Sequence, residues 1–184
     1  MARVPYPTRE DLPPEKRHIY DEMAQNRGGV ALSLRSLLGN PEAAAKVAAV
    51  GAYIRFESSL KPALRELAIL TTAREANGQY EWTHHEPLAR KAGLGDAAIA
   101  AVRDGKAPAG LTPEEATVVR YARELGRTRG VSDPTFEAAR KTFGLPGVID
   151  LTVAVGYYLM LFHVLQAFQV ELEPELEPLL PGGV

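Results

Sequence analysis

Two adjacent histidines, His84 and His85, stand in a stretch whose side chains could move protons, GQYEWTHHEPLARKAGL over residues 78–94. A histidine titrates near neutral pH, and a carboxylate that accepts its second N–H fixes the tautomer and raises the basicity of the ring. Glu66 can supply that carboxylate, because it lies among apolar residues (ALRELAIL) where an unpaired charge is costly. We therefore predict that Glu66 and His85 form a proton-transferring pair. The alternative is an ion pair of Glu66 with Arg74 or another arginine on a neighbouring helix.

Three further side chains could contribute to a ligand site. Tyr80 and Trp82 either form the floor of an apolar pocket or anchor the start of their helix in the core, with their polar atoms reaching water at its edge. His163 is a polar residue in the strongly apolar segment YYLMLFHVLQAF. It is either a hydrogen-bonded core residue or, where it faces Glu66, part of the site.

Metal binding is the other chemistry that this cluster suggests, since Glu81 and Glu86 flank the two histidines. Adjacent residues of a helix point about 100° apart, so His84 and His85 cannot both bind one ion. Glu81 and His85 have the spacing of two ligands on one helix face, but two ligands do not complete a site. We expect no metal. We also expect no organic cofactor, because Gly28-Gly29 lacks the strand and spacing of a phosphate-binding loop.

Composition narrows the classes of function. The 21 Lys and Arg nearly balance the 23 Asp and Glu, so the formal net charge of −2 does not favour nucleic acid or an acidic membrane as a partner. The sequence has no apolar run long enough for a membrane span and no signal peptide, which predicts a cytoplasmic protein. The absence of cysteine excludes disulfides, thiolate nucleophiles and dithiol redox chemistry.

Apolar residues recur at helical spacing, and no alternating strand pattern or hairpin turn is found. We predict an all-α single domain over residues 1–184, a bundle of eight or nine helices. Residues 148–170 begin with β-branched side chains but are far too long for a normal strand. The proline-rich residues 1–14 and the segment 172–184 are expected to be extended arms. The expected helices lie within residues 13–25, 30–40, 41–57, 60–76, 83–94, 96–103, 111–129, 132–144 and 148–170.

Local signals mark several helix ends. Thr112 and Glu115 have the spacing of a capping box, and Asn77-Gly78 is typical of a helix C-terminus. The start of the histidine-bearing helix is ambiguous: a start at Thr83 would leave Pro87 inside the first turns, whereas a start at Pro87 avoids the lost hydrogen bond. Either choice leaves the histidines near a helix N-terminus, where the helix dipole favours a neutral imidazole that donates to an oxyanion.

The segment LRELAILTTAREANGQYEWTHHEPLARKAGL, residues 64–94, resembles the core of the carboxymuconolactone decarboxylase family, which includes alkylhydroperoxidase D-like proteins. In this resemblance the family glutamate falls on Glu66 and the family histidine on His85. The redox members carry C-x-x-C-x-x-x-H, and the second cysteine falls on Glu81 and the first near Gly78 or Gln79. The chain therefore resembles the cysteine-free branch, and a thiol peroxidase is excluded.

The resemblance implies an enzyme that acts on a small carboxylate or lactone, and a helical homo-oligomer, commonly a trimer or hexamer. Loss of CO₂ needs a donor to the forming enolate, a proton source for the carbon and a dry pocket. His85, oriented by Glu66, is expected to be the donor, and either His84 or Tyr80 to deliver the proton.

An arginine such as Arg35, Arg55 or Arg74 could hold a second substrate carboxylate through two hydrogen bonds, although no motif selects one of them. The rival interpretation is a non-catalytic oligomeric module of the same fold. A cavity lined by His85, with the imidazole in hydrogen-bond reach of Glu66, favours the enzyme; burial of both residues without a cavity favours the module.

Overall fold

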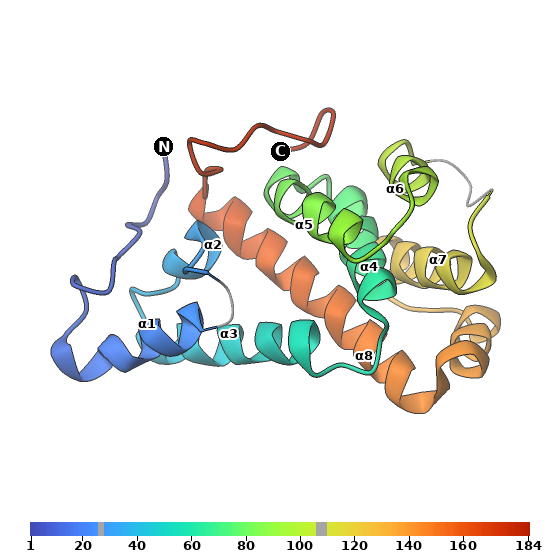
Figure 1. The fold of residues 1–184 in the computed structure, drawn as a ribbon, viewed down its shortest axis with the longest axis horizontal. Coiled ribbons are helices and arrows are strands. Elements are labelled where there is room, and N and C mark those ends of the chain that lie inside the picture. The colour runs from blue at the N-terminus through green and yellow to red at the C-terminus, as the bar shows by residue number, and fades with distance from the viewer. Residues whose placement is uncertain (26–27, 106–109) are drawn as a thin grey trace.

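The computed structural model describes residues 1–25, 28–105 and 110–184. Over these residues the chain is helical and contains no strand, which confirms the predicted all-α class (Figure 1). The helices are α1 (Arg17–Ala24), α2 (Leu32–Arg35), α3 (Pro41–Phe56), α4 (Pro62–Ala76), α5 (Gln79–Lys91), α6 (Asp96–Arg103), α7 (Pro113–Thr128) and α8 (Asp133–Phe168), with the short 3-10 helix η1 (Pro14–Lys16) before α1.

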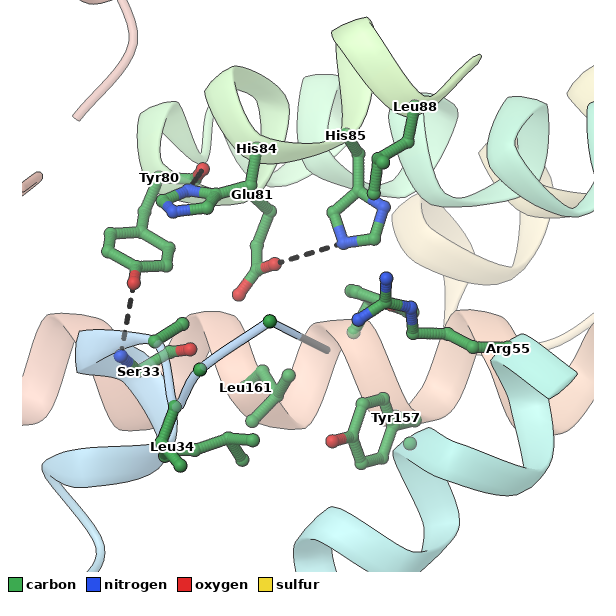
Figure 2. Close-up of a pocket in the computed structure, with 16 residues that line it drawn as sticks. Ser33, Leu34, Arg55, Tyr80, Glu81, His84, His85, Leu88, Tyr157 and Leu161 are labelled. Carbon is green, nitrogen blue, oxygen red and sulfur yellow. Dashed lines mark hydrogen bonds and ion pairs between the residues drawn. The ribbon is translucent and has the colours of Figure 1, made fainter. Parts of the chain in front are cut away.

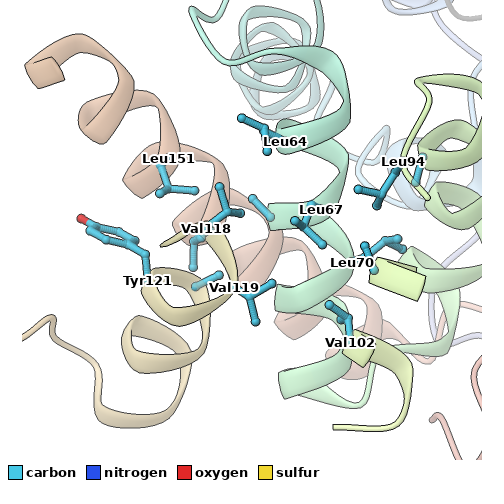
Figure 3. Packing of buried hydrophobic residues seen from close by; sticks show 14 of the residues in the cluster. Leu64, Leu67, Leu70, Leu94, Val102, Val118, Val119, Tyr121 and Leu151 are labelled. Carbon is cyan, nitrogen blue, oxygen red and sulfur yellow. The ribbon is translucent and has the colours of Figure 1, made fainter. Parts of the chain in front are cut away.

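Helix α4 lies at the centre of the bundle and packs against α5, α6, α7 and α8. Its Leu67 and Leu70 are fully buried, and Figure 3 shows both within a cluster of leucine and valine side chains from the surrounding helices. Truncation of such a leucine to alanine typically costs about 2–5 kcal/mol. A polar side chain on α4 is therefore held in a firmly packed frame.

Residues that terminate helices behave as the sequence predicts. The Thr112 side chain accepts a hydrogen bond from the Glu115 N–H at 3.3 Å, and the Glu115 carboxylate accepts one from the Thr112 N–H at 2.8 Å, so the capping box is formed. Asn77 ends α4 in the left-handed conformation, with φ of 58°. This turn reverses the chain and lays α5 back along α4, which brings Glu66 of α4 and His85 of α5 together.

Helix α8 consists of two helical parts separated at Gly144, whose φ of 66° and ψ of 176° suit glycine rather than residues with a side chain. The second part crosses the bundle diagonally between α3 and α4 (Figure 1). By length and composition alone α8 could cross a membrane, but 50% of its most apolar window is buried inside the protein. Core helices of soluble proteins have the same character, so this is weak evidence for a span.

Helix α3 joins this centre through a smaller apolar cluster, in which Ile54 packs with Ile69 of α4 and with Tyr157 and Tyr158 of α8. A separate cluster holds α1, α2 and α3 together around Leu34 and related residues. These two clusters fix α2 and α3 opposite α5 and leave a space between them.

Both ends of the chain are attached to the bundle. The Arg3 N–H donates to the Phe168 carbonyl at 2.8 Å, so the N-terminal segment runs past the end of α8. The C-terminal segment crosses to the start of α5, where the Gln79 N–H donates to the Val184 carbonyl at 2.9 Å. Leu180 of this segment is buried in the main core. The C-terminal segment thus covers one end of α5.

Candidate active site

Helix α5 carries both histidines, and it begins earlier than the sequence predicts. It starts at Gln79 and continues through Pro87 to Lys91, so His84 and His85 lie in its middle and not in an entry turn. Tyr80 and Trp82 are buried, and their packing holds the first turn in place despite the hydrogen bond that Pro87 cannot donate. The effect expected from the N-terminal helix dipole falls off within the first turn and does not act on these histidines.

His85 and Glu66 are brought together across α4 and α5. The His85 Nδ1 lies 2.8 Å from Glu66 Oε2, and both side chains are almost completely buried. An ionised carboxylate only accepts hydrogen bonds, so Nδ1 carries the proton of this bond. In the neutral ring Nε2 is then an unprotonated nitrogen, and it faces away from Glu66 toward the interior of a cavity.

Glu66 is stabilised as an anion. Burial raises the pKa of its carboxyl group, but the hydrogen bond from His85 and the positive charges of His85, Arg65 and Arg55 outweigh burial and lower the pKa below its usual value. The Arg65 guanidinium lies 3.4 Å from Glu66 Oε1. Arg74, the other predicted partner, instead donates to the Arg103 carbonyl. Glu66 therefore has one imidazole partner and one arginine partner.

A cavity of about 440 Å³ lies on the Nε2 side of His85. Its apolar walls include Leu34, Leu88 and Leu161, and its polar groups come from α3, α5 and α8 (Figure 2). The lining residues are Gly28, Gly29, Val30, Ala31, Ser33, Leu34, Gly51, Arg55, Tyr80, Glu81, His84, His85, Leu88, Tyr157, Tyr158 and Leu161. A mostly apolar cavity with a few convergent polar groups is typical of a small-molecule site.

Of the three arginines considered from the sequence, only Arg55 lines this cavity. Figure 2 shows its side chain extending from α3 toward His85. Within the described residues, its guanidinium forms no ion pair at hydrogen-bonding distance, and it lies 5.3 Å from the centre of the Phe56 ring. Arg35 instead holds the N-terminal segment by donating to the Pro7 carbonyl at 3.1 Å.

His84 faces the C-terminal segment. Its Nδ1 lies 2.9 Å from the Tyr80 carbonyl and its Nε2 lies 3.1 Å from Glu173 Oε2, so both nitrogens face acceptors. Burial lowers the pKa of His84, but the hydrogen bonds to Glu173 and to the Tyr80 carbonyl outweigh burial and raise it. A protonated ring would donate to both acceptors, and these two contacts fix His84 at the cavity wall.

Glu173 closes this wall from the C-terminal segment, a contact that sequence reasoning missed. Its Oε1 accepts from the Tyr80 hydroxyl at 2.8 Å and from the Leu32 N–H at 3.2 Å. Burial raises the pKa of Glu173, but hydrogen bonds from His84, the Leu32 N–H and Tyr80 outweigh burial and lower it to about 2. The Tyr80 hydroxyl also accepts from the Ser33 N–H at 3.1 Å, which joins α2 to α5.

Glu81 is the second carboxyl group beside His85. It lies one helical turn before His85, lines the cavity, and has Oε2 at 3.9 Å from His85 Nε2. Its Oε1 has no hydrogen-bond partner in the described part of the chain. The sequence signals for this residue are its spacing of four from His85, which is typical of two metal ligands on one helix face, and its place at the second cysteine of the redox motif.

The structure does not bring Trp82 or His163 to the cavity. Trp82 is fully buried in the main core, where its indole N–H donates to Glu86 Oε2 at 2.7 Å. His163 lies on the exposed face of α8, with its ring 5.6 Å from that of Phe162. Within residues 1–25, 28–105 and 110–184, no group of three or more His, Cys, Asp or Glu side chains is arranged to hold a metal ion.

Comparisons with known proteins agree with this architecture. Residues 41–124, which include α3 to α5, match the model of the carboxymuconolactone decarboxylase family. No curated protein matches the chain. The sequence-based family resemblance is confirmed over these residues.

Several crystal structures share the fold. A peroxidase-related protein from Ralstonia eutropha JMP134, described as an alkylhydroperoxidase AhpD core, superposes with a TM-score of 0.79 at 17% identity and covers 95% of this chain and 93% of its own. A peroxidase-related protein from Silicibacter sp. TM1040 gives 0.77 at 18% identity over 95% and 93% of the two chains. A variant of the debrominase Bmp8 in complex with 2,3,4-tribromopyrrole gives 0.77 at 14% identity over 93% and 91%. These similarities show a common fold.

Proposed function

We propose that this chain, whose residues 41–124 match the model of the carboxymuconolactone decarboxylase family, is a member of that family and a cofactor-independent lyase that moves a proton on a small carboxylate or lactone. The observation that carries the proposal is the orientation of His85. Its Nδ1 is held by Glu66 at 2.8 Å, while its Nε2 faces a cavity of about 440 Å³. A histidine in this setting can take up or release a proton at a bound ligand near neutral pH.

In the reaction that we propose, a carbon–carbon bond to a carboxylate breaks and CO₂ leaves. The electron pair of that bond passes into a neighbouring carbonyl and forms an enolate, whose oxygen needs a hydrogen-bond donor. Glu66 accepts the Nδ1 hydrogen bond of His85 and so orients the ring with Nε2 toward the ligand, where we propose that Nε2 donates to the enolate oxygen. Positioned acid–base groups of this kind contribute about 10²–10⁴-fold to a rate.

Arg55 is the group that we propose to hold a substrate carboxylate. Among the described residues that line the cavity, Arg55 is the arginine, and an arginine can bind a carboxylate through two parallel N–H donors. The apolar side chains of Leu34, Leu88 and Leu161 would exclude water from the remainder of the ligand. A compact molecule with an apolar or lactone body and two carboxylates, one that leaves as CO₂ and one that Arg55 holds, fits this arrangement.

We further propose a cytoplasmic homo-oligomer, a trimer or hexamer, without nucleic acid or membrane as a partner. Helices α3 and α8 expose several large apolar side chains, among them Val50, Phe56, Ile149 and Val153, with exposed fractions of 37–52%. A groove of about 430 Å³ runs between these helices. Tyr157 lines both this groove and the cavity, so a second subunit seated there would contact the cavity wall. Val153→Lys should dissociate the oligomer in analytical ultracentrifugation, and Leu179→Lys should not.

The first test is ligand-induced thermal stabilisation with carboxymuconolactone and a panel of simpler unsaturated lactones and small carboxylic acids. A ligand at 100 times its Kd stabilises the folded state by about 2.7 kcal/mol. The wild type and His163→Gln, in which a histidine outside the cavity is replaced, should show the same stabilisation. His85→Gln and Arg55→Gln should lose it. Equal stabilisation of wild type and His85→Gln would remove His85 from the site.

A second measurement separates an enzyme from a binding module. Turnover of the compound that stabilises the protein is followed by release of CO₂ and by deuterium incorporation at carbon in D₂O. Glu66→Gln should lower kcat by about 10²-fold or more with little change in KM, because Glu66 fixes the tautomer and orientation of the His85 ring and does not line the cavity. Stabilisation by a ligand without any turnover would identify the rival function, a non-catalytic ligand-binding module.

A further inference from the structure

Glu81 is a buried carboxyl group that the proposed proton transfer by Glu66 and His85 does not use. Its side chain extends from α5 into the cavity, with an exposed fraction of 4% for the residue (Figure 2). Within the described residues, Oε1 has no hydrogen-bond partner. Oε2 lies 3.9 Å from His85 Nε2. The distance exceeds a hydrogen bond and leaves room for a ligand atom that contacts both groups.

An ionised carboxylate at this position would be poorly compensated. The charged and titratable groups that act on it are His85 and His84 on α5, Glu173 on the C-terminal segment and Tyr158 on α8. His85 gives its Nδ1 proton to Glu66, and His84 is paired with Glu173. Burial of an unpaired charge is costly, and a carboxyl group avoids that cost by keeping its proton.

The environments of the two glutamates beside His85 shift their pKa values in opposite directions. Burial raises the pKa of Glu81, and the positive charges of His85 and His84 oppose this only in part, with Glu173 adding to the rise. Glu66, in contrast, has its pKa lowered by its hydrogen bond with His85 and by nearby arginines, which outweigh burial. Titratable groups whose environments push their pKa values apart are suited to the roles of acid and base in one reaction.

We propose that Glu81 rests as a neutral carboxylic acid and is the proton donor of this site, delivering its proton to the carbon of the bound ligand. The proposal rests on the function proposed above. After CO₂ has left, the electron pair of the enolate forms a C–H bond with the Glu81 proton, and Glu81 becomes a carboxylate. A proton from solvent, passed on by His85 Nε2, then restores the acid. In sum, one carboxylate and one proton give CO₂ and the protonated product.

Glu81 fills this role better than the two donors expected from the sequence. Both nitrogens of His84 face acceptors outside the cavity space, namely the Tyr80 carbonyl and Glu173. The Tyr80 hydroxyl donates to Glu173, and burial raises its pKa far above the usual value. Glu81 has an unpartnered oxygen in the cavity and an imidazole next to it that can return the proton.

An infrared spectrum of the ligand-free protein at neutral pH tests whether the Glu81 carboxyl group carries a proton. A protonated carboxyl group has a C=O stretching band separate from that of a carboxylate, and ¹³C labelling of glutamate shifts it. We expect this band in the wild type and in Glu86→Gln, and its loss in Glu81→Gln. Glu86 is a matched control, because it is a buried glutamate of the same helix that has Arg90 as a partner at 2.8 Å. Identical spectra of wild type and Glu81→Gln would overturn the proposal.

Wild-type protein alone gives a second readout, should Glu81→Gln fold poorly. One glutamate carboxyl carbon should keep the ¹³C chemical shift of the protonated form at neutral pH. With carboxymuconolactone as the probe, Glu81→Gln should lower kcat by about 10²–10⁴-fold and leave KM nearly unchanged, since the amide still donates a hydrogen bond but no proton. Absence of turnover in the wild type would count against the proposed function, whereas absence of the carboxyl proton counts against Glu81.

Discussion

Gly51 sets the space available to Tyr157, and its replacement by alanine gives a sharp test of the cavity geometry. A Cβ atom at Gly51 would lie 2.4 Å from the Tyr157 hydroxyl oxygen and 2.9 Å from the ring carbon that bears it. The Tyr157 ring packs edge-on against Tyr158 at 5.3 Å, and Tyr158 packs in the same way against His85 at 5.0 Å. An added methyl group must therefore displace a chain of rings that ends at the candidate catalytic histidine.

Two opposing effects determine the change in stability. Alanine is favoured over glycine within a helix by about 1 kcal/mol, whereas overpacking of a filled site costs about 1–3 kcal/mol. We expect Gly51→Ala to range from neutral to about 2 kcal/mol less stable than wild type. Gly126→Ala in α7 is the matched control, because its Cβ would meet only Glu75 Cβ at 3.6 Å, an ordinary contact. That variant should be up to about 1 kcal/mol more stable.

Urea and thermal unfolding of the two variants measure the difference directly. The overpacking cost alone predicts that Gly51→Ala melts about 2–12 °C below Gly126→Ala, at about 2–4 °C per kcal/mol for a chain of this size. Gly51→Ala should also reduce ligand-induced stabilisation, since Tyr157 moves toward the cavity. Equal stabilisation of the protein by both substitutions would show that Tyr157 moves freely, and the argument that Gly51 shapes the cavity would fail.

Three further substitutions have defined outcomes. Glu173→Gln should speed amide hydrogen exchange in the C-terminal segment. Because the folded pKa of Glu173 is lowered to about 2 from 4.5, the stabilisation by this carboxylate is present above pH 4.5 and is lost as the pH falls toward 2. Near pH 2, wild type and Glu173→Gln should therefore exchange at the same rate. Glu81→Gln should have a higher melting temperature than wild type at neutral pH, because the raised folded pKa of Glu81 destabilises wild type increasingly as the pH rises above 4.5. The difference in melting temperature between variant and wild type should therefore be larger at pH 7 than at pH 4. An equal difference at both pH values would contradict the raised pKa of Glu81. Asp150→Asn should cost about 1–3 kcal/mol in urea unfolding, because Asp150 is buried and accepts from the Tyr53 hydroxyl and from the N–H and hydroxyl of Ser59 at 2.6–2.7 Å, and an amide supplies one acceptor oxygen in place of two.

The elements that the sequence predicted well are those fixed by local physics. The capping box at Thr112 and the turn at Asn77 depend on a few adjacent residues, and both form as expected. The start of α5 depends on tertiary packing, and the rule for Pro87 gave way to the burial of Tyr80 and Trp82. Local patterns therefore placed the helices, but they did not place the histidines along α5.

The residues of the candidate site also divide into those that the sequence could predict and those that only tertiary packing brings to the cavity. The contact of Glu66 with His85 was expected, because an apolar helix leaves a glutamate few ways to be paired. Arg55 could not be chosen from three similar arginines, since only the packing of α3 opposite α5 brings it to the cavity. Glu173 lies 93 residues from Tyr80 in the sequence, and no periodic pattern links two positions so far apart.

The attachment of the C-terminal segment also has a consequence for the order of folding. Glu173 joins residues separated from it by 93 and 141 positions, Tyr80 and Leu32, so these contacts close very long loops. During synthesis the chain emerges from its N-terminus, and α3 to α5 can pack before Glu173 exists. The wall of the cavity is then completed only when residue 173 has left the ribosome. A nascent chain stalled before residue 173 should already contain the Glu66–His85 pair yet lack a closed ligand site.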